Sequence, residues 1–168
     1  MSSCWGSICF LAFLGVAFVS GRPLEDIKNA QESIAEVLNL KGLEVGLNPL
    51  FSAVIKSNSS IPLRVNEMNA TLDVYRQIFS SILSDNHSSS LLKLLNTTTR
   101  KSVRSDVEKL QGRITTLTEK FGPENNNSKD ILSKLKEIKV GNHLVQRKAL
   151  AEFLEVDHAA DVILSPRV

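Results

Sequence analysis

The chain has 168 residues, a formal net charge of +2 and two cysteines. This balance of charge does not indicate a nucleic-acid or membrane-surface partner, and no run beyond residue 21 is long and apolar enough to cross a bilayer. The length suits one domain that can bury a substantial core.

The first 21 residues are predicted to be a secretory signal peptide. Residues 8–19 form an apolar run of twelve residues, interrupted only by Gly15, which is too short to span a membrane but suits a signal-peptide core. Small residues precede the expected cleavage after Gly21. A membrane anchor or a buried helix is the alternative. Both cysteines, Cys4 and Cys9, lie in this segment, so the mature chain is expected to be secreted, extracellular, free of disulfides and not inserted in a membrane.

N-x-S/T triplets agree with a secretory route and predict glycosylation at one or more sites. Chance occurrence is the alternative, because Asn and Ser are abundant in this chain. The triplet at Asn69 falls within a helical pattern, on the flank of its apolar face. The five predicted acceptors are Asn58, Asn69, Asn86, Asn96 and Asn126.

The rest of the chain carries the 3-4 spacing of apolar residues that is typical of helices, and no strand pair or internal repeat. An irregular connection is expected over 42–48, and a buried strand is the alternative for the short run after Pro49. Tyr75 and Phe79 are predicted to lie in the core. In chain order, helices are predicted over residues 24–40, 49–57, 63–84, 102–121, 128–140 and 142–156, with a turn or short helix at 91–95.

The helix predicted over residues 142–156 is apolar around most of its circumference. One stripe contains Val145, Ala149, Phe153 and Val156, and a second contains Leu150 and Leu154. The wide polar gap consists of Lys148, Glu152 and Glu155. Such a helix is buried on most sides, so it needs neighbours all round it, and a second chain is one candidate for them. The helical domain is expected to end at residue 156, with 157–168 as a short flexible tail.

No chemistry-bearing motif stands out. His87, His143 and His158 are not spaced as metal ligands, and no cysteine follows the signal segment. Nucleophile, phosphate-loop and paired-carboxylate motifs are absent from the sequence, so no enzyme, metal or cofactor is expected. Arg100, Lys101 and Arg104, together with the lysines of 129–139, could bind a polyanion weakly. A solvated helix exterior is the favoured explanation, because acidic residues are interleaved with these basic ones.

From Val145 the chain reads V-Q-R-K-A-L-A-E-F-L-E-V. This run resembles the last helix of the type II interferons, the interferon gamma family, whose pattern there is close to V-Q-R-K-A-I-x-E-L-I-x-V. Fainter agreement extends over residues 131–140, 69–83 and 49–56. The resemblance therefore covers most of 24–156, and is strong over the last helix.

The resemblance implies an all-α, four-helical-cytokine-like bundle of about six helices, built as an intertwined homodimer. The last two helices of each chain would pack into the other chain, which would place Val145, Ala149, Leu150, Phe153 and Leu154 in a shared core. Gln146 and Arg147, which project between apolar positions, are expected to be partly buried and hydrogen-bonded.

The implied function is that of a cytokine that brings together class II cytokine receptor chains and triggers Janus-kinase and STAT signalling for antiviral defence and macrophage activation. The expected partners are interferon gamma receptor-like ectodomains. In the family the receptor surface uses the first helix, the loop after it and part of the last helix. The residues at these places are Ile27, Gln31, Lys41, Gly42, Glu44, Asn48 and Glu152.

Two departures from the family pattern bear on this interpretation. Family members usually end in a basic tail, whereas residues 157–168 contain one base, Arg167; related forms without the tail occur in fish. Residues 86–100 resemble an insertion. Two other classes remain open: a secreted lipid-binding protein with amphipathic helices, and an interleukin-10-like monomeric helical cytokine, a group that usually carries disulfides.

Overall fold

The computed structural model describes residues 22–56, 60–84, 91–122 and 129–165. Within these residues it contains seven α-helices, one 3₁₀ helix and no strand, which confirms the all-α class. The elements are α1 (Arg22–Val37), α2 (Leu43–Gly46), α3 (Ser52–Ile55), α4 (Ile61–Leu83), η1 (Leu91–Leu94), α5 (Thr97–Phe121), α6 (Lys129–Lys136) and α7 (His143–Leu164).

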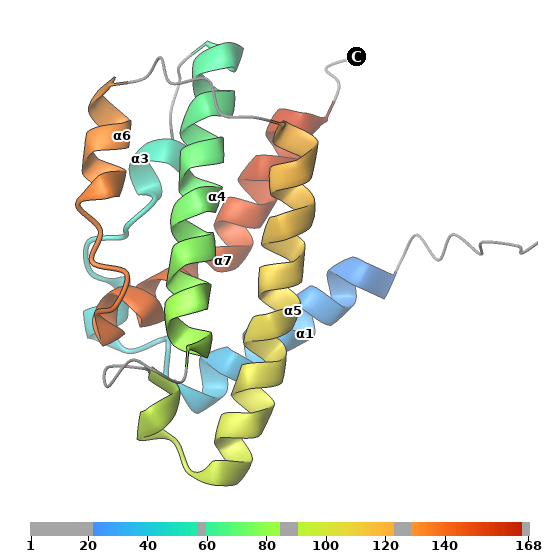
Figure 1. The fold of residues 1–168 in the computed structure, drawn as a ribbon, viewed down its shortest axis with the longest axis vertical. Helices are drawn as coiled ribbons and strands as arrows, with labels where there is room; N and C mark the ends of the chain where they lie inside the picture. Colours follow the sequence, from blue (N-terminus) through green and yellow to red (C-terminus); the bar gives the residue numbers. More distant parts are fainter. Residues whose placement is uncertain (1–21, 57–59, 85–90, 123–128, 166–168) are drawn as a thin grey trace, which may run out of the picture.

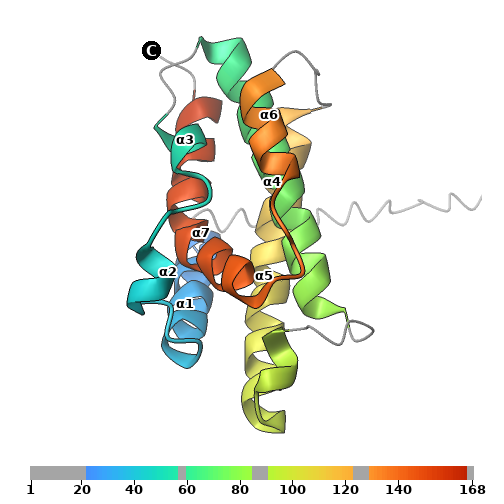
Figure 2. The same ribbon diagram turned by 90° about the vertical axis from the view of Figure 1, so that its left-hand side faces the viewer.

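The long helices α4 and α5 lie side by side, and α7 runs behind them (Figure 1). The helix α1 packs along α5 and also contacts α7. In the view rotated by 90°, α1, α2 and α3 lie on the same side of the molecule as α7, while α6 lies on the outer side of α4 (Figure 2). The last helix is therefore enclosed by α1, α4 and the short elements between them.

An aromatic cluster forms the centre of this core. Tyr75 stacks on Phe51 with ring centroids 4.7 Å apart, and contacts Phe79 and Phe153 edge to face at 5.5 and 5.9 Å. All four side chains have zero exposure. The buried Tyr75 hydroxyl donates to the Ala149 carbonyl at 2.9 Å, as a buried polar group requires. The predicted core positions of Tyr75 and Phe79 are confirmed.

Two helices extend beyond the limits predicted from apolar spacing. The helix α5 begins at Thr97 rather than near 102, because the Asn96 side chain caps it by accepting from the Thr99 N–H at 2.9 Å. The helix α7 continues to Leu164, so the predicted flexible tail is wrong for residues 157–164. Residues 166–168 lie outside the described part of the chain.

Two smaller differences concern the connection after α1. The segment predicted to be irregular contains α2, whose Val45 is buried. The run after Pro49 is helical, which settles the helix-or-strand alternative, although α3 is limited to four residues. Among the described helices, none has the length and apolar character needed to cross a membrane.

Candidate functional site

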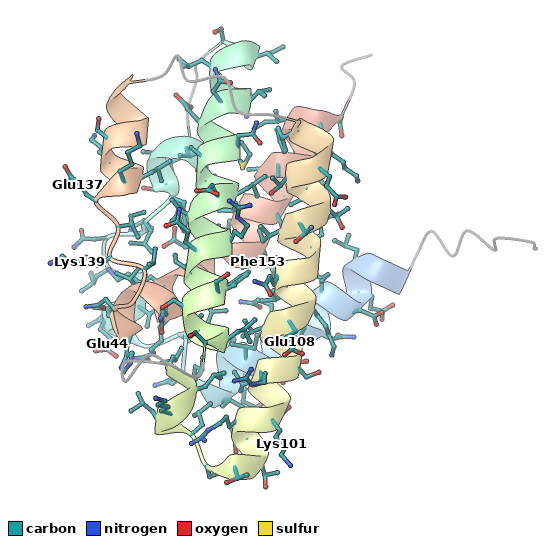
Figure 3. The ribbon with its side chains drawn as sticks, viewed as in Figure 1. Glu44, Lys101, Glu108, Glu137, Lys139 and Phe153 are labelled. Atoms are coloured by element: carbon teal, nitrogen blue, oxygen red, sulfur yellow. The ribbon has the colours of Figure 1, made fainter. Side chains whose placement is uncertain are left out.

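Polar side chains on α7 hold the connection segment, defined here as residues 38–51. Arg147 donates to the Asn39 carbonyl at 3.1 Å and forms an ion pair with Glu44. Figure 3 places Glu44 at the outer edge of the molecule, beside the first turns of α7. Gln31 adds a weaker tie between α1 and α7, with its amide nitrogen 3.4 Å from the Leu150 carbonyl.

Lys148 and Glu152, one turn apart, hold the next part of the connection segment. The Lys148 ammonium donates to the carbonyls of Leu47 and Asn48, the latter at 3.1 Å. The Glu152 carboxylate accepts from the backbone N–H groups of Leu50 at 2.7 Å and Phe51 at 2.9 Å. The two charged groups thus satisfy backbone groups that have no helical partner at the end of α2 and the start of α3.

Burial makes Glu152 an unusual carboxylate. Its side chain is 9% exposed, and desolvation by burial raises its pKa above the ordinary value. The Leu50 and Phe51 N–H groups oppose this shift, the charge of Glu155 adds to it, and the charge of Lys148 opposes it. Burial, and to a smaller extent the nearby charge of Glu152, raises the pKa of the Tyr75 hydroxyl well above 10.0. Both groups serve as hydrogen-bonding anchors in this environment.

The outer face of the connection segment carries exposed apolar side chains. Leu43 is 81% exposed and Leu47 is 55% exposed, whereas Val45 between them is buried against the bundle. Because Leu43 and Leu47 are four residues apart across α2, they lie on the same face of this turn. An open groove of about 750 Å³ lies beside the segment, between α1 and α7, and is lined in part by Glu32, Glu36 and Lys41. Apolar and charged groups are therefore both available to a partner.

The predicted receptor contacts separate into two groups. Lys41, Glu44 and Asn48 are exposed, and Gly42 is half-buried beside Asn39 and Arg147. By contrast, the side chains of Ile27, Gln31 and Glu152 are 8%, 9% and 9% exposed and face the bundle. These three side chains therefore offer little surface to a receptor, although Gln31 lines the groove between α1 and α7, and their part in receptor binding stays a prediction.

The residues expected in a shared dimer core are accommodated within one chain. Ala149, Leu150 and Phe153 have zero exposure, and Val145 and Leu154 are half-buried against the same core. The neighbours that the sequence required around this helix are thus supplied by α1, α2, α3, α4 and α5. Gln146 is fully buried, more than the partial burial expected, and its amide nitrogen donates to Ser81 Oγ at 3.2 Å and to the Val140 carbonyl at 3.1 Å, which confirms the expected hydrogen bonding.

A second group of charges joins α5 to the last turns of α7. Arg113 Nε lies 2.6 Å from Asp157, and its Nη2 lies 2.6 Å from Asp161. The Asp157 side chain is 4% exposed; burial raises its pKa, while the bond to Arg113 opposes the shift. With Ala160 fully buried on the same part of the helix, this fork explains why α7 stays helical past residue 156.

The predicted glycosylation sites differ in accessibility. Asn69 is 6% exposed and its amide nitrogen donates to the Gly122 carbonyl at 3.3 Å, so the fold disfavours a glycan on this nitrogen. Asn96 is exposed, and it uses its side-chain oxygen, not the nitrogen that a glycan modifies, as the cap of α5. The sites at Asn58, Asn86 and Asn126 lie outside the described residues.

The basic residues around the start of α5 are partly committed to structure. The Arg100 guanidinium donates to the carbonyls of Leu92 and Leu95 at 2.9 and 3.0 Å, which ties η1 to α5. Lys101 is exposed near the end of the molecule (Figure 3). Exposed lysines of the other basic run lie on α6 and just beyond it, at Lys134, Lys136 and Lys139.

Within the described residues no group of three or more His, Cys, Asp or Glu side chains is arranged to hold a metal ion. His143 is half-buried in the first turn of α7 and His158 is exposed on the same helix, while His87 lies outside the described part. Among the described residues, one group of charged side chains holds the connection segment and another holds the end of α7.

The roles of Lys148 and Arg147 in holding the connection segment could not be predicted from the sequence. The available signal was the polar gap of Lys148, Glu152 and Glu155 on a helix that is otherwise largely apolar. A cation and an anion one turn apart on a buried helix need specific partners, but the spacing alone does not say which segment supplies them. Leu43 and Leu47 gave no signal, because single exposed leucines are ordinary in soluble proteins.

No family model, curated protein or solved structure matches the chain.

Proposed function

We propose that the protein is a secreted helical cytokine of the interferon gamma type, which engages a class II cytokine receptor and triggers Janus-kinase and STAT signalling for antiviral defence and macrophage activation. The observation that carries the proposal is the position of the run that resembles the family's last helix. Its apolar residues lie in the aromatic core, and its polar residues Arg147, Lys148 and Glu152 bind the connection segment. The apolar and the polar residues that carry the resemblance thus both take part in the packing of α7.

The proposed receptor surface is the outer face of the connection segment with the adjoining end of α1. Leu43 and Leu47 provide exposed apolar area, and Lys41 and Glu44 provide charges beside it. Protein interfaces commonly combine a desolvated apolar centre with a polar rim. Lys41 and Glu44 are exposed here and are also among the receptor contacts that the resemblance implies.

A lipid-carrying function is less compatible with the packing. An amphipathic-helix lipid carrier needs broad apolar helix faces that are free to meet lipid. Here the apolar faces of α1, α4, α5 and α7 are turned into one core, and the large exposed hydrophobic residues among the described ones are spread over several elements. Co-sedimentation of the secreted protein with vesicles would favour this alternative over the cytokine.

The proposed assembly is a homodimer in which α6 and α7 exchange between chains. In such an exchange the helices occupy the same positions in the partner as they do here, so the core contacts are preserved without new ones. Because α7 already has its core neighbours within one chain, an interleukin-10-like monomer is the second candidate. Light scattering of the secreted protein at micromolar concentration separates them: a mass of about twice one glycosylated chain supports the exchange, and one chain's mass contradicts it.

The direct test of function uses protein secreted by cells that express the full chain. It is offered to a panel of immobilised class II receptor ectodomains, and STAT phosphorylation is measured in macrophage-like cells. The double variant Leu43→Ser/Leu47→Ser is expected to lose both signals. Leu94→Ser, at an exposed leucine of η1 outside the proposed surface, is the matched control and should retain them. Absence of ectodomain binding and STAT phosphorylation with the unchanged protein would refute the proposal.

A further inference from the structure

The contacts between α7 and the connection segment are made largely to backbone atoms. Arg147 and Lys148 donate to carbonyls of the segment, and Glu152 accepts from two of its N–H groups. The ion pair between Arg147 and Glu44 is the side-chain contact in this set. Backbone contacts do not depend on which side chains the segment carries, so they hold its path and leave its side chains free.

The segment's own side chains are divided accordingly. Val45 and Phe51 are 3% and 0% exposed and anchor it from beneath, whereas Leu43 and Leu47 project outwards. Asn48 turns the chain with a φ of 53°, a conformation that Asn tolerates better than most residues. The Lys148 ammonium bonds the carbonyl of this same residue. The path of the backbone is therefore specified at three successive points by one helix.

We propose that Arg147, Lys148 and Glu152 are positioning residues that hold the backbone of the connection segment, so that its outward side chains form a preorganised surface for a protein partner. Holding a loop in its bound conformation lowers the entropy lost on binding. The partner that fits has an apolar patch for Leu43 and Leu47, flanked by basic groups that face Glu32 and Glu36 of the adjoining groove. This partner assignment rests on the proposed receptor-binding function.

We call the contacts of Arg147, Lys148 and Glu152 with the connection segment the clamp. Hydrogen exchange tests the clamp without a partner. The amides of Leu50 and Phe51 donate to Glu152, so Glu152→Gln, which offers one acceptor in place of two, should speed exchange within residues 50–51 by about tenfold or more. Lys148→Met should do the same across 43–51, and Lys148→Arg should restore protection because it keeps a cation. The controls are Glu155→Gln, on the exposed side of α7, and Lys139→Met. Amides in α4 report general loss of stability.

Receptor binding then separates positioning from recognition. The clamp variants should weaken ectodomain binding by about tenfold together with faster exchange. Leu43→Ser and Leu47→Ser should weaken binding while exchange in the segment stays unchanged.

The inference is overturned if Glu152→Gln and Lys148→Met leave exchange in the segment unaltered, or if they speed exchange in α4 by the same factor. If the unchanged protein binds no ectodomain, the proposed function fails, and the exchange comparison still decides whether the clamp exists.

Discussion

Truncation of Phe153 tests the central packing of the fold. Its ring has zero exposure and lies 5.9 Å, centroid to centroid, from both Tyr75 and Phe79. Phe153→Ala removes a fully buried aromatic side chain and leaves a cavity between α4 and α7, which should cost about 3–5 kcal/mol of the free energy of unfolding. Since a domain of this kind has roughly 5–15 kcal/mol in total, the loss is a large part of its stability.

A second substitution separates the ring interactions from the burial. Phe153→Leu keeps most of the apolar volume but loses both aromatic pairs, so its expected cost is about 1–2 kcal/mol. Val162→Ala, on the same helix at a side chain that is 50% exposed, is the control and should change stability by less than about 0.5 kcal/mol. Urea unfolding followed by circular dichroism measures all three, and unchanged slopes would show that the transitions are comparable. A cost below about 1 kcal/mol for Phe153→Ala would refute the placement of this ring in the core.

Three further outcomes follow from the polar contacts. Arg113→Met should lower the free energy of unfolding by about 3 kcal/mol, because it leaves the buried Asp157 carboxylate without its cation; thermal unfolding should show that adding Asp157→Asn recovers part of this loss, and no recovery would mean that the two groups are not coupled. Burial raises the pKa of Asp157 above its usual 3.8, so the folded chain binds this proton more readily than the unfolded chain, and acidification from neutral pH towards about pH 4 adds stability through this group. The unfolding free energy of the unchanged protein minus that of Asp157→Asn should therefore rise as the pH is lowered, and a fall in this signed difference would contradict the assigned burial. Mass spectrometry of protein expressed through a secretory pathway should find Asn69 unmodified, because its amide is buried against Gly122; a glycan at that residue in the folded protein would contradict the placement of α4.

The long helices could be predicted from sequence because their apolar residues recur at helical spacing over many turns. Tyr75 and Phe79 both have zero exposure, as predicted for core residues. The ends of these helices were harder to predict where the apolar spacing stops but the helix continues. Residues 97–101 contain no apolar side chain, and they remain helical because Asn96 caps them and Arg100 ties them to η1.

The end of α7 illustrates the same limit with charged residues. Asp157 and Asp161 in the sequence indicate a polar, solvated tail. The fold brings Arg113 of α5 between them, 44 and 48 residues away along the chain, and a charge that has a partner can be buried where an isolated one cannot. Nothing local to residues 157–164 specifies that partner.

By itself the sequence determined the all-α class and the inward faces of the long helices, and it marked 142–156 as a helix with neighbours on most sides, because burial of periodic apolar residues depends mainly on the chain's own pattern. Only the tertiary structure decided what the polar gap of that helix does and which residues of the connection segment face outwards. Lys148 and Glu152 bind backbone atoms roughly a hundred residues earlier in the chain. Backbone carbonyls and N–H groups are the same in every residue, so no sequence pattern marks those that a distant side chain will bind.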